Sequence, residues 1–343
     1  MHEKLGSGDG AVFVQTNEAE GNRVLALSRN SNGQLSQAES YSTGGSGDGS
    51  PHLTSQGSVV LSEDGAHLLV TNAGSDELTA FTVGDEGLSL LDTLSSGGGA
   101  PKSVAEHDGL VYALNTGPPA LAGFRLEDGG LVALTESQRE LSAGADPAQV
   151  GFSPDGSALV VTDRASNSIV LVPVDGEARL GEPTVSPSAG PTPYGFAFAR
   201  GGALVVTEAF GAETGRAAAS SYLLRGTSLE PVSRSVGNGR SEICWAVATS
   251  DGYVFTTNFA DGAVSRYAVD ADGTLVLAAA VAGAAVEGQP GLRDEDLSAD
   301  ERFLYAIDAD AGRVYGWAVE GGELTALGSW NGLPATLAGL AAS

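Results

Sequence analysis

The stretch FSPDGSALVVTD, residues 152–163, is an apolar run, a tight turn and a second apolar run that ends in a short polar residue. An Asp-Gly pair between two such runs predicts a β-hairpin. Similar phrases recur along the chain, and the second run occurs seven times, each time ending in a hydrogen-bond acceptor. The seven run ends are Asn17, Asn72, Asn115, Asp163, Glu208, Asn258 and Asp308.

Each of these runs belongs to a longer repeating unit. A third β-rich run follows, as in SIVLVPV at 168–174, and then a turn that leads to a leucine. These leucines lie 43 to 53 residues apart along the chain, at Leu35, Leu88, Leu131, Leu180, Leu229, Leu275 and Leu324. Seven units of four antiparallel strands at this spacing predict an all-β fold, a seven-bladed β-propeller.

The first unit lacks its first strand, and a matching run lies at the other end of the chain. The segment PATLAGLAA, residues 334–342, is apolar and has no partner near it in sequence. We expect it to pair beside residues 11–15 and so close the ring without an open sheet edge. The whole chain, 1–343, would then be a single propeller domain.

Composition excludes several function classes. The 343 residues carry a formal charge of −26, so attraction to nucleic acid or to an anionic membrane is not expected. The single cysteine, Cys244, cannot form an internal disulfide. The N-terminal residues lack the apolar core of a signal peptide, which predicts a cytoplasmic protein, with a trimmed secreted form as the alternative. We expect a monomer that acts on a small molecule.

Antiparallel order predicts where a site would lie. The first strand of each unit begins at the rim of the ring where the second strand ends, so residues at both places share one face. We expect a substrate to be bound there by Gln56, Ser103, Gln149, Tyr194, Phe210, Trp245 and Asn258. The alternatives are structural: Asn and Asp at strand ends commonly cap turns, and buried aromatic rings pack cores.

The repeated phrases resemble one known family. SQGSVVLSEDG, ADPAQVGFSPDG, PTPYGFAF, TEAFG and LSADERFLYAID together resemble the lactonase-type seven-bladed propellers, which include 6-phosphogluconolactonases and carboxymuconate-lactonizing enzymes. The resemblance covers essentially the whole chain. Such members usually carry histidines where this chain has Ala148, Gly195 and Val247, whereas Glu208 and Arg293 match residues that the family retains.

The resemblance implies a hydrolase, or a related lactonizing isomerase, that acts on a small lactone or sugar-acid-like molecule without a cofactor. Glu208 would then be the general base or proton shuttle, and Arg293 would bind a carboxylate or stabilise an oxyanion. Because the family's histidines are replaced, a non-catalytic propeller that binds a ligand or partner is the alternative. A calcium-dependent lactonase using Glu208 and the other run ends is a third possibility, since hard cations prefer oxygen ligands.

Overall fold

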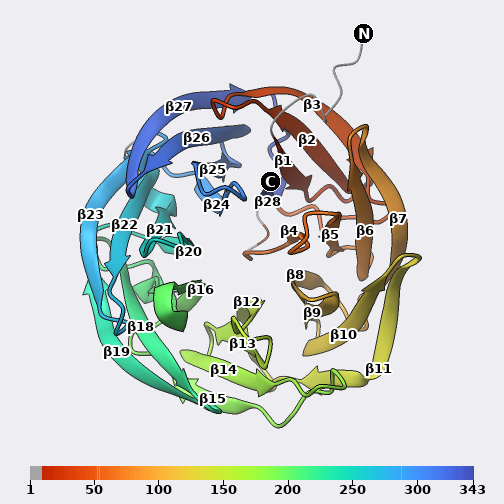
Figure 1. Cartoon of the computed structure of the whole chain (residues 1–343), viewed down its shortest axis with the longest axis horizontal. Helices are drawn as coiled ribbons and strands as arrows, with labels where there is room; N and C mark the ends of the chain where they lie inside the picture. Colours follow the sequence, from red (N-terminus) through yellow and green to blue (C-terminus); the bar gives the residue numbers. More distant parts are fainter. Residues whose placement is uncertain (1–9, 52, 54, 287) are drawn as a thin grey trace.

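Seven four-stranded antiparallel sheets are arranged in a ring around a central axis (Figure 1). This computed structural model describes residues 10–51, 53, 55–286 and 288–343. Each sheet is one blade of a propeller, and we number the blades 1 to 7 along the chain. The seven-bladed propeller predicted from the sequence is therefore confirmed.

The first four blades are formed by residues up to Pro187, together with the C-terminal strand β28. Blade 1 consists of β28 (Leu337–Ala342), β1 (Gly10–Thr16), β2 (Arg23–Arg29) and β3 (Leu35–Ser42). Blade 2 consists of β4 (Val59–Leu61), β5 (His67–Asn72), β6 (Glu77–Gly84) and β7 (Gly87–Ser95). Blade 3 consists of β8 (Pro101–His107), β9 (Leu110–Thr116), β10 (Pro119–Glu127) and β11 (Gly130–Glu140). Blade 4 consists of β12 (Pro147–Phe152), β13 (Ala158–Asp163), β14 (Ser168–Pro173) and β15 (Thr184–Pro187).

The remaining three blades complete the ring. Blade 5 consists of β16 (Pro193–Ala199), β17 (Ala203–Glu208), β18 (Ala218–Arg225) and β19 (Ser228–Gly237). Blade 6 consists of β20 (Ile243–Ala248), β21 (Tyr253–Asn258), β22 (Ala263–Val269) and β23 (Leu275–Ala284). Blade 7 consists of β24 (Leu292–Leu297), β25 (Phe303–Asp308), β26 (Arg313–Glu320) and β27 (Glu323–Asn331). Short 3-10 turns are η2 (Arg200–Gly202), η3 (Phe210–Ala212) and η4 (Phe259–Asp261).

The C-terminal strand closes the ring. β28 pairs antiparallel with β1, from Val12 opposite Ala342 to Thr16 opposite Leu337. The predicted pairing of the chain's two ends is thus confirmed, and β28 is the innermost strand of blade 1 (Figure 1).

The burial of each strand follows its place in its blade. The second strands are almost wholly buried, as in β13, β17 and β25, because neighbouring blades cover both of their faces. Such strands read as near-continuous apolar runs. The outermost strands alternate between exposed and partly buried residues, as β19 does. The core therefore lies between blades, where side chains such as Trp245 and Tyr267 pack. Within the described ranges, no helix is long and apolar enough to cross a membrane.

Candidate functional site

One pocket lies at the rim where the first strands begin. It has a volume of about 430 Å³ and is formed by blades 5, 6 and 7. We call it the rim pocket. It is lined by Thr192, Tyr194, Ala209, Gly211, Ala212, Glu242, Ile243, Cys244, Phe259 and Arg293. Residues from strand starts and strand ends thus meet on one face, as antiparallel order requires.

Arg293 is the cation of this pocket. Its side chain is only 9% exposed, and its guanidinium lies 4.5 Å from the centre of the Phe259 ring. Nη2 donates a hydrogen bond to Asp310 at 3.0 Å, and the two side chains form an ion pair. Nε is buried and has no hydrogen-bond partner within the described chain. A ligand oxygen could accept a hydrogen bond from this Nε–H group.

Two further cations lie at the same rim. Arg164 donates to Asp146 at 2.7 Å and to the Tyr194 hydroxyl at 3.0 Å, and its Nε has no hydrogen-bond partner among the residues described. Burial, together with the positive charge of Arg164, lowers the pKa of Lys102 to about 8. The rim therefore holds three basic side chains, of which Arg293 and Arg164 form ion pairs with Asp310 and Asp146.

Cys244 is a buried neutral thiol. Burial raises its pKa to about 12, although the charges of Arg293 and Arg164 act in the opposite direction. The thiolate is the nucleophilic form of cysteine. Cys244 therefore forms part of the pocket wall and is not a nucleophile.

Glu242 also lines the rim pocket, immediately before β20. Glu242 was not among the site residues predicted from the sequence. Its backbone has a φ of +52°. This left-handed conformation is uncommon for residues other than glycine. The missed signal was its place just before the strand start.

Glu208 lies outside the pocket lining. Its carboxyl group is fully buried and accepts hydrogen bonds from Gly190 N at 2.8 Å, Ser220 Oγ at 2.5 Å and Ser235 Oγ at 2.7 Å. Burial raises its pKa, against the lowering effect of these hydrogen bonds. These contacts join β17 to the outer strands of its own blade. They favour a structural role, and the catalytic role of Glu208 stays a prediction.

Three of the expected substrate-binding residues make hydrogen bonds between the innermost segments of different blades. Gln56 Nε2 donates to Ala246 O at 2.9 Å, and its Oε1 accepts from Ala246 N at 3.2 Å, which joins blade 2 to blade 6 across the centre of the ring. Ser103 donates to Gln56 O at 2.7 Å. Gln149 pairs in the same two-bond way with Phe196. These polar groups are occupied by protein partners.

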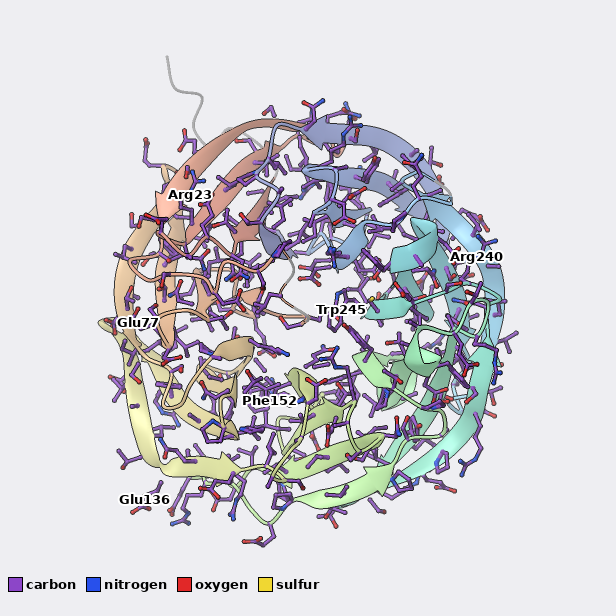
Figure 2. The ribbon with its side chains drawn as sticks, turned by 180° about the vertical axis from the view of Figure 1, so that it is seen from behind. Arg23, Glu77, Glu136, Phe152, Arg240 and Trp245 are labelled. Atoms are coloured by element: carbon purple, nitrogen blue, oxygen red, sulfur yellow. The ribbon has the colours of Figure 1, made fainter. Side chains whose placement is uncertain are left out.

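The other expected contacts are divided between the pocket and the core. Tyr194 lines the pocket, and its ring lies 4.7 Å from that of Trp245, which is fully buried beside the central opening (Figure 2). Phe210 lies between two lining residues, with Arg216 5.0 Å above its ring. Asn258 is fully buried and donates to Ser265 at 2.9 Å. Among the predicted residues, the rim pocket therefore brings together Tyr194 and Arg293.

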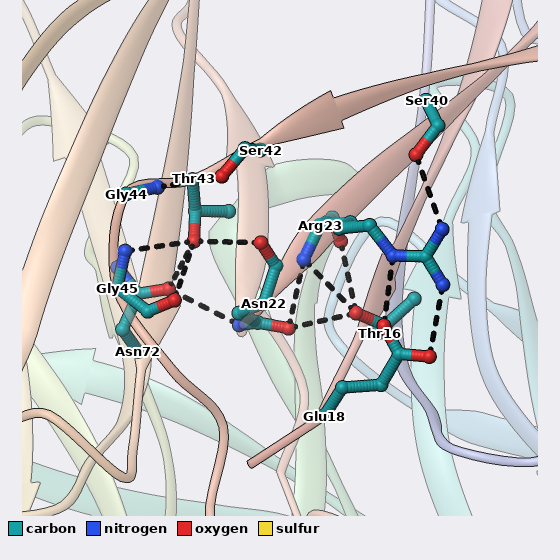
Figure 3. Close-up of polar contacts among 10 residues, drawn as sticks. All are labelled: Thr16, Glu18, Asn22, Arg23, Ser40, Ser42, Thr43, Gly44, Gly45 and Asn72. Atoms are coloured by element: carbon teal, nitrogen blue, oxygen red, sulfur yellow. Dashed lines mark hydrogen bonds and ion pairs between the residues drawn. The ribbon is translucent and has the colours of Figure 1, made fainter. Parts of the chain in front are cut away.

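The remaining strand-end acceptors cap loops. Figure 3 shows the example of Asn72, whose Oδ1 accepts hydrogen bonds from Asn22 at 3.1 Å and Thr43 at 2.7 Å. Asn22 in turn accepts a hydrogen bond from Thr16, whose hydroxyl oxygen accepts one from Arg23 N. This network ties blade 1 to blade 2, as turn-capping side chains would. Within the described ranges, no group of three or more His, Cys, Asp or Glu residues is arranged to hold a metal ion.

Comparison with known proteins identifies the family. The model of the lactonase family, described as a seven-bladed β-propeller, matches residues 7–126 and 205–335, which is more than half of the chain. The chain belongs to the lactonase family of seven-bladed β-propellers. No curated protein matches the sequence significantly.

Solved structures of similar proteins share this lactonase-family fold. A provisionally named 6-phosphogluconolactonase from Bacteroides fragilis aligns over 97% of this chain and 98% of its own, with 18% identity and a TM-score of 0.70. A periplasmic gluconolactonase from Pseudomonas aeruginosa aligns over 97% and 98%, with 17% identity and a TM-score of 0.73. A protein from Lactobacillus plantarum aligns over 97% and 99%, with 17% identity and a TM-score of 0.75.

Proposed function

We propose that the rim pocket hydrolyses a small lactone of the sugar-acid type. The observation that supports this most directly is Arg293, a buried guanidinium with an unpartnered Nε–H in a pocket of about 430 Å³. Pockets of this size suit small organic ligands. The names of two similar structures, a gluconolactonase and a 6-phosphogluconolactonase, agree with lactone chemistry.

Arg293 would act on the carbonyl oxygen of the lactone. When water adds to the carbonyl carbon, that oxygen gains a full negative charge, and a fixed cation stabilises the charged state more than the neutral substrate. Phe259 holds the guanidinium from one side and Asp310 from another, so it needs little reorganisation. The apolar walls made by Ile243, Phe259 and Tyr194 suit the carbon skeleton of the ring.

Replacement of Arg293 tests this proposal. Proton release at constant pH would measure hydrolysis of five- and six-membered sugar-acid lactones by the wild-type protein and by Arg293→Gln. We expect kcat/KM to fall about 10²–10³-fold, the usual cost of losing one oxyanion donor. Arg293→Lys, which keeps the charge, should retain part of the activity.

The control is Arg225→Gln, because Arg225 forms an exposed ion pair with Glu230 on the outer strands. It should leave turnover unchanged. Thermal unfolding of each variant would separate a lost oxyanion donor from a lost fold. The proposal would be contradicted if the wild-type protein hydrolysed no lactone faster than the uncatalysed reaction. It would also be contradicted if Arg293→Gln folded and kept full activity.

A binding function without turnover is the second candidate. No histidine in the described part of the chain lines the rim pocket, so the family's usual proton-transfer group is missing there. A binding propeller would be stabilised by sugar acids, because a ligand that binds only the folded state raises the unfolding temperature. Thermal shifts without any lactone hydrolysis would favour this function over the first.

A further inference from the structure

We propose that Glu242 is the general base that activates water in the rim pocket, an inference that rests on the lactone hydrolysis proposed above. Glu242 and Arg293 are the acidic and the basic side chains of the pocket lining. The negative charge of Glu242 raises the pKa of the Cys244 thiol, and the positive charge of Arg293 lowers it. An anion and a cation thus lie around the same small space.

The backbone around the pocket is unusually strained, which supports a functional role for this residue. Eleven residues other than glycine have positive φ in the part of the chain that the structure describes. Four of them gather here: Thr192, Phe210, Ala212 and Glu242, with φ values of 57°, 50°, 65° and 52°. Strained conformations persist where the surroundings hold them, and they concentrate at functional sites.

The carboxylate of Glu242 is free while its backbone is fixed. Its carbonyl oxygen accepts hydrogen bonds from Phe259 N at 2.9 Å and from the Cys244 thiol at 3.4 Å. Within the described residues, no hydrogen bond or ion pair engages the carboxylate, and the residue is partly exposed. A base must reach water and keep a lone pair available, and Glu242 meets both conditions.

Other proton acceptors near the rim are less suitable. The oxygens of Glu208 are already engaged by three donors and are fully buried. The thiol of Cys244 stays protonated. Lys102 lies outside the pocket lining and donates to Pro147 O at 3.5 Å.

The reaction is balanced with these two side chains alone. Glu242 takes a proton from water while the water oxygen bonds to the carbonyl carbon of the lactone, and the carbonyl oxygen becomes an oxyanion beside Arg293. The oxyanion then re-forms the carbonyl as the bond from carbon to the ring oxygen breaks. The ring oxygen takes the proton from Glu242 and becomes a hydroxyl group. The product is the open hydroxy acid, and the base is regenerated.

Glu242→Gly is the sharpest variant, because glycine adopts positive φ without strain and the fold should be kept. We expect kcat/KM to fall about 10²–10⁴-fold, the usual contribution of a positioned base. Added formate, a small carboxylate, should restore part of the turnover to Glu242→Gly.

The matched control is Glu301→Gly. Glu301 has a φ of 56° and lies in the turn between β24 and β25, at the opposite ends of these strands from the rim pocket. Its carboxylate accepts a hydrogen bond from Ser250 Oγ, in the turn between β20 and β21. It should keep full turnover with no response to formate. Glu208→Gln, which removes the base that the sequence predicted, is a second comparison and is expected to lose stability because the hydrogen bonds from Ser220 and Ser235 are disturbed.

The outcomes separate this inference from the proposed function. If the wild-type protein hydrolyses lactones and Glu242→Gly is fully active, the role of Glu242 is overturned while the hydrolase function stands. So would a folded but inactive Glu208→Gln beside an active Glu242→Gly. A wild-type protein without lactone turnover would overturn the hydrolase function and this inference with it.

Discussion

Three consecutive carboxyl groups, Asp294, Glu295 and Asp296, occupy the innermost strand of blade 7. Asp294 accepts a hydrogen bond from Leu340 N at 3.0 Å, and Asp296 accepts one from Ala342 N at 2.9 Å. Alternate residues of a strand face the same side, so these two acids reach the closing strand β28 together. Burial raises the pKa of Asp294 and Glu295 well above the usual range, and that of Asp296 to about 7.

The stability of the fold should therefore fall as pH rises. A carboxyl whose pKa is higher in the folded state holds its proton more tightly there, so its contribution is complete below the unfolded pKa and is lost as pH rises through the folded value. For Asp296 that window runs from about pH 4 to about pH 7. Each pH unit within it costs at most about 1.4 kcal/mol. Urea unfolding at pH 5, 6, 7 and 8 would measure the free energy of unfolding.

Asp296→Asn is the variant that isolates this effect. The amide keeps an oxygen that can accept the hydrogen bond from Ala342 N but carries no titratable proton. The loss of stability between pH 5 and pH 8 should be smaller in this variant than in the wild type. An identical pH dependence in the two proteins would show that Asp296 does not contribute.

At the residue scale, the sequence predicted those pocket residues whose positions depend only on the order of the strands. Arg293 and Tyr194 were predicted at the rim and line the pocket. Glu242 was missed because its positive φ and its place in the pocket arise from the loop geometry before β20. The burial of Glu208 depends on Ser220 and Ser235, which lie on outer strands whose register no hairpin motif specifies.

At the scale of elements, the repeating hairpins determine where the strands of each blade lie. Contacts between the innermost strands of different blades determine which side chains fill the centre of the ring. The apolar runs and turns predicted four strands in every blade, and the structure has them. The same reasoning assigned Gln56 to a substrate, because a polar side chain at a channel mouth suggests a ligand contact. Its actual partner, Ala246, lies 190 positions away, and only the closed ring brings the two together.

Gln56 should accordingly contribute to stability. Removing its amide in Gln56→Ala leaves the buried backbone N–H and C=O of Ala246 without their partner. An unsatisfied buried polar group costs about 1–3 kcal/mol. We therefore expect Gln56→Ala to unfold at a lower urea concentration than the wild-type protein. Gln34→Ala is the control, because the side chain of Gln34 makes one exposed hydrogen bond, to Leu327 O, and its loss should change stability little. Equal effects of the two substitutions would contradict a bracing role for Gln56.

At the scale of the whole molecule, the ring joins residues that are distant in sequence into one surface. The rim pocket draws on blades 5, 6 and 7, and its position depends on every blade keeping its place. The seven repeats were enough to predict the ring and its closure. The volume and charge of the pocket were not predictable, because they depend on how side chains from different blades pack.

Closure of the ring by β28 leads to the last prediction, that deleting residues 334–343 destabilises the entire fold. All six residues of β28 are buried, and the C-terminal carbonyl oxygen of Ser343 accepts a hydrogen bond from Arg29 at 2.9 Å. Without β28, β1 has an unpaired edge, and Asp294 and Asp296 lose their partners.

The expected loss is most of the free energy of unfolding, which for natural proteins is about 5–15 kcal/mol. Circular dichroism and urea unfolding would measure it, and a synthetic peptide of residues 333–343 should restore stability when added to the truncated chain. A ring held only by contacts between adjacent blades would instead lose blade 1 alone. Two separate unfolding transitions, with the main one at the wild-type midpoint, would therefore show that closure does not hold the blades together.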